Sequence, residues 1–327
     1  MSKPFSEYLG ARPFLYGRDL LKRMGVQGHY VDENDVLDFL GYETRPLNPE
    51  EHRAILEMSG IGDIFDDTCA ITFYHDSIMF ISESLPFTRK RCTVFHETGH
   101  DLNDFHPKGI VSISKDSEID SASYKIIERD AFYAGSEVMF PLKHFLADST
   151  SLPLELSSID SIAQKYAASY EATGIRYALT NQNIMALLVV KENDLIANMT
   201  SSVDGQIIPQ NQLPMQISPS LRPNRSSTTP APLRVQYCVR SHHFPKFIKS
   251  GTEIGKSMCS WSEEGEENLI HKSWRMNLSL TGEIPASVFG SSQAFSYTAE
   301  CRPINGRVFV LLSLPDKQIK LFNGASL

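Results

Sequence analysis

The sequence predicts an α+β protein that contains more than one domain. Helical and strand periodicities occupy separate stretches of the first 150 or so residues, which is typical of a mixed domain. The chain has 327 residues, 41% of them hydrophobic and 21% charged, enough for two or three domains with their own cores. A stretch rich in Pro, Ser, Asn and Gln at about residues 199–232 predicts a linker before a last, strand-containing part.

The first part alternates helices and strands along the chain. Apolar spacing predicts helices near residues 17–24, 32–41 and 49–58. Two β-rich runs at 69–74 and 78–82 flank His75-Asp76-Ser77, which predicts a hairpin. Helices are then expected at about 88–103 and 123–140, the second ended by Pro141.

The region around residues 158–181 predicts two short helices. Ser158 and Ser169 are suitable N-caps for them, and the tight turn between them suggests a helix-turn-helix-like unit. Beyond the linker, residues 235–239 alternate in strand fashion and residues 308–312 are continuously apolar. The end of the chain therefore predicts a β-containing domain.

Charge and cysteine usage narrow the class of protein. The formal net charge of −8 disfavours nucleic-acid binding by default, because neutralising phosphates requires clustered Lys and Arg. The five cysteines are scattered, form no C-x-x-C pair, and suggest buried thiols in a reducing compartment. No signal peptide or membrane-spanning run is apparent, so we expect a cytoplasmic protein.

The strongest chemical motif is the HExxH pattern His96-Glu97-Thr98-Gly99-His100. On a helix, His96 and His100 lie one turn apart on the same face, so both imidazoles can bind one metal ion. Glu97 lies beside them and is the candidate general base for water activated by zinc. Cys92, Phe95, Gly99 and Leu102 form an apolar stripe at helical spacing that would bury the opposite side of the helix. An amphipathic helix that carries two histidines by chance is the alternative explanation.

A catalytic zinc site requires a third protein ligand, and the sequence offers two. His106 lies ten residues after His96, as in the metzincin signature, except that Asn103 stands where that signature has glycine. Asn tolerates a left-handed turn, so this departure is acceptable. Glu128, on the next predicted helix, is the other candidate, as in peptidases with two histidines and a glutamate.

The motifs resemble those of the ImmA/IrrE metallopeptidase family, in particular the three-domain IrrE branch. A hairpin precedes the helix in both, and the family pattern R-x-F-T-x-A-H-E-x-G-H is matched at Arg91, Thr93, His96, Glu97, Gly99 and His100. Cys92 and Phe95 depart from the usual Phe and Ala. The segment 128–141 resembles the family's E-x-x-A-x-x-F-A-x-x-L-L-x-P helix, with Ala134 where Phe is usual. The first Glu of that helix is a metal ligand, so the resemblance selects Glu128.

The resemblance also implies an architecture. It implies a zincin-like metallopeptidase domain at 1–150, in which the HExxH helix packs on a small sheet. A helix-turn-helix-like segment is expected at 151–185. A GAF-like α/β domain at 186–327, which includes the linker, would sense a small-molecule or protein signal.

The resemblance implies a site-specific endopeptidase with a helix-turn-helix repressor as its substrate. Cleavage would induce a stress-response regulon of the DNA-damage type, or a mobile-element regulon. We expect zinc in the site, with manganese as the alternative, and no cofactor beyond the metal. The hairpin at residues 71–81 is expected to supply the edge strand on which the substrate docks.

Two rival functions remain at this point. A non-catalytic, metal-binding transcriptional regulator would act through its helix-turn-helix and C-terminal domains, but a structural metal site does not need Glu97. Its candidate recognition helix offers Arg176 as the only cation and begins near Glu171, which opposes phosphate binding. Direct nucleic-acid binding is therefore not expected. The other rival is a metzincin-like peptidase of broad specificity, with His106 as the third ligand.

Overall fold

The computed structural model describes residues 12–48, 69–104, 106, 110–111, 121–192, 233–241, 244–255, 268–292 and 295–314. The chain forms two compact units, Met1–Asn181 and Gln182–Leu327. The predicted helix at 49–58 and the whole of the predicted linker at 199–232 lie outside the described residues. Both units combine helices with a sheet, so the predicted α+β class is confirmed.

The first unit contains a four-stranded sheet in the order β1-β3-β2-β4. Its strands are β1 (Glu43–Leu47), β2 (Ala70–Phe73), β3 (Ile78–Ser82) and β4 (Ile110–Val111). The predicted hairpin is confirmed as the antiparallel pair β2 and β3, whereas β1 runs parallel to β3. Pro46 in β1 is compatible with an edge position, because an edge strand does not need every N–H.

The prediction that the hairpin provides the sheet edge is wrong. In the described part of the sheet, both hairpin strands are internal, and β1 and β4 form the edges. The short strands β1 and β4, which the sequence did not predict, flank the hairpin on its two sides. The strand β4 pairs with β2 only at Thr72 and Phe73.

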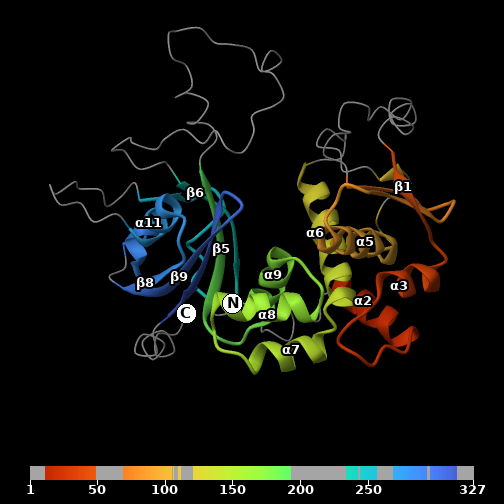
Figure 1. Cartoon of the computed structure of the whole chain (residues 1–327), viewed down its shortest axis with the longest axis horizontal. Coiled ribbons are helices and arrows are strands. Elements are labelled where there is room, and N and C mark those ends of the chain that lie inside the picture. Colours follow the sequence, from red (N-terminus) through yellow and green to blue (C-terminus); the bar gives the residue numbers. More distant parts are fainter. Residues whose placement is uncertain are drawn as a thin grey trace, which may run out of the picture. The chain divides into compact units, whose positions relative to one another are not determined.

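Helices cover the sheet and pack on one another in the first unit (Figure 1). They are α2 (Arg12–Arg23), α3 (Glu33–Leu40), α5 (Phe87–Leu102), α6 (Ser121–Met139), α7 (Leu142–Thr150), α8 (Leu156–Lys165) and α9 (Tyr170–Thr180). Helix α3 shows how the sequence sets its limits. The side chain of Asp32 caps its first turn, and Gly41 ends it in the left-handed conformation at φ 79°.

Helices α5 and α6 form the centre of this unit. Both were predicted within two residues of their observed ends, and α6 ends before Pro141 as expected. A further helix, α7, begins directly after that proline and was not predicted. Helix α5 contacts β2 and β3, while α6 lies between α5 and α2. The central position of α5 explains why its face opposite the sheet is also buried.

The segment predicted to resemble a helix-turn-helix consists of α8 and α9. Ser169 caps α9 as predicted and accepts a hydrogen bond from the backbone N–H of Ala172 at 3.2 Å. Ser158 does not cap α8, because the helix already begins at Leu156. Its hydroxyl instead donates to the carbonyl oxygen of Pro153 at 2.7 Å. Both helices belong to the first compact unit.

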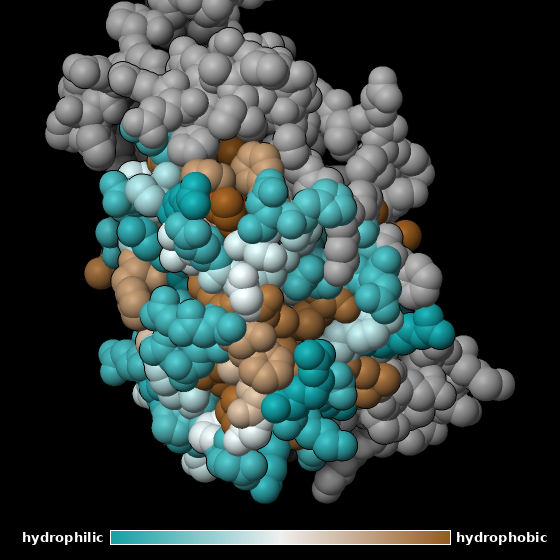
Figure 2. Space-filling model, turned by 90° about the vertical axis from the view of Figure 1, so that its right-hand side faces the viewer, coloured by the Kyte–Doolittle hydropathy of each residue, from teal (hydrophilic) through white to brown (hydrophobic). Residues whose placement is uncertain are grey.

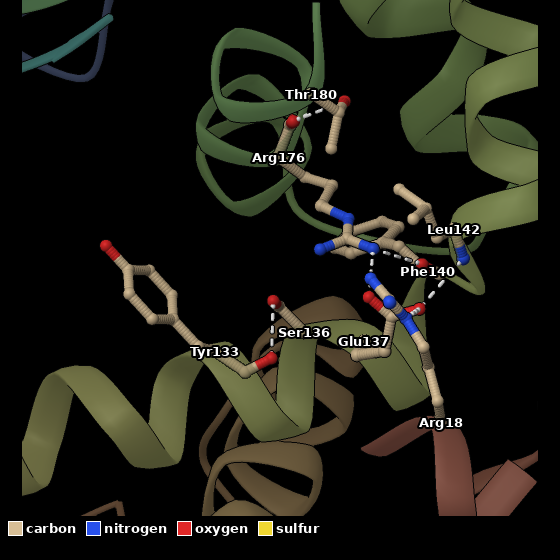
Figure 3. Close-up of polar contacts among 8 residues, drawn as sticks. All are labelled: Arg18, Tyr133, Ser136, Glu137, Phe140, Leu142, Arg176 and Thr180. Carbon is tan, nitrogen blue, oxygen red and sulfur yellow. Dashed lines mark hydrogen bonds and ion pairs between the residues drawn. The ribbon is translucent and has the colours of Figure 1, made fainter. Parts of the chain in front are cut away.

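A buried ion-pair network fastens α9 to the rest of the first unit (Figure 3). Arg176 donates from Nη2 to Oε2 of Glu137 at 2.6 Å and to the carbonyl oxygen of Phe140 at 3.0 Å. Arg18 from α2 donates to the other carboxylate oxygen of Glu137 at 3.2 Å. Both Arg176 and Glu137 are 1% exposed. Arg176, the only cation that the sequence offers on this helix, is therefore enclosed.

The second unit contains a six-stranded antiparallel sheet in the order β7-β6-β5-β10-β9-β8. Its elements are β5 (Met185–Glu192), β6 (Leu233–Arg240), β7 (Glu253–Ile254), α11 (Leu269–Met276), β8 (Leu280–Pro285), η3 (Ala286–Phe289), β9 (Ser296–Ile304) and β10 (Arg307–Ser313). Alternate residues of β5, β9 and β10 supply one core, against which α11 packs. This unit therefore has a core of its own.

The surface of the first unit carries scattered apolar side chains. Figure 2 shows one face of the molecule, on which hydrophilic residues surround a strip of hydrophobic ones. Large exposed apolar residues of this unit include Leu15, Phe39 and Phe87, and the guanidinium of Arg23 lies over the ring of Phe39 at 5.4 Å. Within the described residues, no helix combines the length and the apolar character needed to span a bilayer.

Candidate metal centre

His96 and His100 lie on the same face of α5, one turn apart, as their spacing predicted. Their ring planes meet at 89°, and their Nε2 atoms are 3.2 Å apart. His100 is 2% exposed, whereas the side chain of His96 is 19% exposed. The two Nε2 atoms therefore face one common position that is reached from the His96 side.

Glycines at the contact between α5 and α6 bring a third side chain to this position. A Cβ atom on Gly99 would overlap the carbonyl group of Ala131, and a Cβ atom on Gly135 would overlap that of Phe95. The absence of these two side chains lets the backbones of the two helices touch. Glu128 precedes Gly135 by two helical turns and so reaches the histidines.

The carboxylate of Glu128 lies against both histidines. Its Oε2 atom is 3.0 Å from Nε2 of His96, and its Oε1 atom is 3.4 Å from Nε2 of His100. The ligand atoms of the three residues all lie within 4.8 Å of one another, and they form the one such group found among the described residues. Two imidazole nitrogens and a carboxylate are a donor set that suits zinc. The residues present therefore fit the predicted metal.

The charges in this group favour a cation between the three side chains. Burial raises the pKa of Glu128, but hydrogen bonds with His100 and His96 lower it by a larger amount. The resulting pKa of Glu128 lies well below the usual range. Burial lowers the pKa of His96, but the hydrogen bond and charge of Glu128, together with the charge of Glu97, hold it above the usual value. The carboxylate charge that favours a protonated histidine would also favour a divalent cation at the same position.

Glu97 lies beside the three residues but outside their group. It is 1% exposed, and its Oε2 atom accepts a hydrogen bond from the hydroxyl of Thr72 at 2.9 Å. Its Oε1 atom is buried without a hydrogen-bond partner among the described residues. Burial raises the pKa of this carboxyl above its usual value. One oxygen is thus fixed, and the other is left to accept a proton.

One strand residue near Glu97 was missed as part of the site, namely Thr72 of β2. Tyr74 lies in the turn that follows this strand. Its hydroxyl is buried without a hydrogen-bond partner among the described residues, and burial followed by the charge of Glu97 raises its pKa far above the usual value. A threonine within the apolar run of β2 was the signal available for Thr72. His75 lies exposed in the turn, as expected.

His106 does not join the group of three residues. Its Nδ1 atom lies 3.1 Å from Nδ1 of His100, the ring nitrogen that faces away from His96 and Glu128. Burial and the neighbouring His100 lower the pKa of His106 to about 4. Asn103 is extended, at φ −95° and ψ 106°, rather than left-handed as a metzincin-like turn would require. The geometry thus separates the two candidates for the third ligand.

A small apolar recess lies beside His96. Its empty volume is about 250 Å³, which includes space open to solvent. Cys92 and Phe95 of α5, together with Phe132 and Met139 of α6, line it. The predicted apolar stripe of α5 therefore packs partly against α6 and partly around this recess.

Other histidine, cysteine and tryptophan residues occur later in the chain. His242 and His243 lie outside the described residues, as do Cys259, Trp261 and Lys256. Trp274 packs against the core of the second unit. The four described cysteines are free thiols, and burial raises the pKa of Cys238 to about 11.

Comparison with known proteins identifies the region that carries the centre. Residues 59–177 match the family described as the IrrE N-terminal-like domain of M78 peptidases, which confirms the predicted resemblance. No curated protein matches the chain. A solved structure described as a Mycobacterium tuberculosis transcriptional regulator is similar at 9% identity and a TM-score of 0.48, over 99% of this chain and 84% of that chain.

Proposed function

We propose, from the premise that residues 59–177 form an IrrE N-terminal-like peptidase domain, that the protein is a zinc-dependent endopeptidase. One observation carries the proposal. Two imidazole nitrogens and the carboxylate of Glu128 converge within 4.8 Å, and next to them Glu97 has a buried oxygen with no hydrogen-bond partner in the described structure. A structural metal site has no need for such a group.

We assign metal binding to His96, His100 and Glu128. A zinc ion held there supplies Lewis acidity, which polarises a peptide carbonyl and makes water more acidic. Manganese is the alternative metal. Glu97 is not one of the three ligand residues, so its carboxylate is available to act as a general base.

Glu97 is the proposed proton carrier. The hydrogen bond from Thr72 holds its Oε2 atom, so Oε1 is the oxygen that accepts the proton of the attacking water. Burial raises the pKa of the carboxyl and makes its anion a stronger base. The same oxygen then returns the proton to the leaving amine.

The proposed substrate is a helix-turn-helix repressor whose cleavage induces a stress-response or mobile-element regulon. The family resemblance of the motifs supports this class. We assign the extended segment of the substrate to the β4 side of the first sheet, because Thr72 on that side contacts Glu97.

The second unit is the proposed sensor. It is a compact unit with its own sheet and core, which suits a domain that binds a small-molecule or protein signal. The GAF-like assignment stays a prediction from the resemblance.

Cleavage is tested with the zinc-loaded full chain in an extract of the source cells. New protein N-termini are labelled and identified by mass spectrometry. We expect a small set of cleavage sites, concentrated in helix-turn-helix repressors, which disappears on chelation and returns with zinc. Glu97→Gln should reduce the cleavage rate by about 10²–10⁴, the usual effect of removing a general base, while zinc content is retained.

Glu83→Gln is the matched control, because Glu83 is an exposed carboxylate of the same unit. It should cleave like the unmodified protein. Full activity in Glu97→Gln would remove this residue from the mechanism. Zinc binding without any cleavage, in both variants and the unmodified chain, would favour the non-catalytic regulator.

A further inference from the structure

The second ring nitrogen of His100 has a partner that the proposed mechanism has not used. Nε2 of His100 faces His96 and Glu128, whereas Nδ1 lies 3.1 Å from Nδ1 of His106. Both rings are buried, His100 at 2% and His106 at 7% exposure. Two imidazole nitrogens at this distance share one proton, so one ring donates and the other accepts.

Only one of the two arrangements suits a metal ligand. If His106 donated, neutral His100 would carry its own proton on Nε2, which faces the other ligands. If His100 donates from Nδ1, its Nε2 atom keeps a lone pair for the metal. His106 then accepts on Nδ1 and carries its proton on Nε2.

The turn after α5 holds His106 in position. The backbone N–H of His106 donates to the carbonyl oxygen of Asn103 at 3.0 Å. The side-chain amide of Asn103 donates in turn to the carbonyl oxygen of Gly99 at 2.5 Å, and Asn103 is 4% exposed. Asn103 therefore ties the turn to the helix that carries both histidines.

We propose that His106 is a positioning residue for the metal centre, which fixes the ring and the metal-binding tautomer of His100. The inference rests on the proposed function, because it takes His100 as a ligand. It assigns His106 a role other than that of the third ligand of a metzincin. A hydrogen bond from the second ring nitrogen orients metal-binding histidines in general, and its loss typically costs 10- to 100-fold in metal affinity.

Three substitutions of His106 separate hydrogen bonding from packing. His106→Asn retains an acceptor, because the amide oxygen can occupy about the place of Nδ1. His106→Leu fills the space without an acceptor, and His106→Ala removes both. The zinc dissociation constant of each full-length variant is measured by competition with a chromogenic chelator. Circular dichroism of the metal-free proteins checks that they are folded.

We expect zinc affinity to fall roughly 10- to 100-fold in His106→Leu and His106→Ala, and to remain within a few-fold in His106→Asn. His75→Ala, which removes an exposed imidazole of the same unit, should bind zinc like the unmodified chain. Unchanged affinity in His106→Leu, or equal loss in His106→Asn and His106→Leu, would overturn the inference.

Cobalt substitution distinguishes a positioning residue from a ligand. The visible absorption bands of bound Co²⁺ should keep their positions in His106→Leu at saturating metal, because the ligand set is unchanged. Altered bands would make His106 a ligand and overturn the inference. Different results would contradict the proposed function. These are that the unmodified chain binds no zinc, or that Glu128→Ala leaves the zinc affinity unchanged.

Discussion

Thr72 is a buried residue that contacts Glu97, the proposed general base. It is fully buried in β2, and its hydroxyl donates a hydrogen bond to the Glu97 carboxylate at 2.9 Å. A hydrogen bond to a charged group contributes about 1.5–3 kcal/mol. Thr72→Val keeps the shape of the side chain and removes this bond, so we expect kcat to fall roughly 10- to 100-fold.

Thr98→Val is the control for this prediction. Thr98 follows Glu97 in α5, is 1% exposed, and has a buried hydroxyl without a partner in the described structure. Its substitution should leave kcat nearly unchanged, and neither variant should lose zinc affinity. Equal kcat values for Thr72→Val and the unmodified chain would mean that Glu97 is positioned by other groups.

At the residue scale, the sequence predicted the groups that share one helix, offered Glu128 from the next helix as one of two candidates, and did not predict a role for Thr72. The spacing of His96 and His100 alone predicts a common face. Choosing Glu128 as the third ligand required the family resemblance. The close contact of the two helices at Gly99 and Gly135 cannot be read from the spacing of residues along the sequence. Thr72 lies 25 residues from Glu97 along the chain, and only the strand pairing and helix packing bring them together.

At the scale of elements, α9 is tied to the first unit by one buried cation. Removing one partner of a buried ion pair leaves the other charge uncompensated, which typically costs 3–5 kcal/mol. We therefore expect Arg176→Ala to lower the free energy of unfolding by about this amount, measured by urea denaturation. The Arg176 guanidinium also lies over the rings of Phe14 and Phe145, at 5.4 Å and 5.9 Å, so packing is lost as well.

Lys165→Ala provides the comparison within the same pair of helices. Lys165 is paired with Asp148 at 2.6 Å, but its side chain is 42% exposed. Exposed pairs contribute about 0–1 kcal/mol, so this variant should be nearly as stable as the unmodified chain. Equal stability of the two variants would mean that Glu137 does not depend on Arg176.

The same ion pair bears on the interpretation of α8 and α9 as a DNA-binding unit. A buried cation is not available to phosphate, and Glu171 lies in the first turn of α9. That this segment does not bind duplex DNA stays a prediction. Sequence-selective binding in a gel shift at ~150 mM salt, lost in a folded Arg176→Ala protein, would contradict it.

Sequence patterns predicted the apolar elements better than the polar or very short ones. The helices α5 and α6 and the hairpin strands follow from their apolar patterns and from Pro141. The edge strand β1 is as long as β3, but it is polar, mostly exposed and contains Pro46, while β4 has only two residues. Both owe their pairing to the hairpin. This is why the sequence placed the sheet edge at the wrong strands.

At the scale of the whole molecule, the chain separates into a unit that carries the candidate metal centre and a unit built on a larger sheet. The net charge of −8 disfavours long-range attraction of nucleic acid, and the absence of such binding stays a prediction. Residues 151–181 fall within the first compact unit, and the division into three domains stays a prediction. Helical spacing alone does not place these residues in that unit, because it does not show the contact between Arg176 and Glu137.

The proposed function requires that His96, His100 and Glu128 hold one metal ion while Glu97 stays unbound. Anomalous diffraction at the zinc edge, from crystals of the zinc-loaded full chain, locates the ion and its ligands. We predict one ion at ~2.0–2.2 Å from Nε2 of His96, Nε2 of His100 and the carboxylate of Glu128. Glu97 should remain unbound. An ion bound by His106, with Glu128 turned away, would contradict the account.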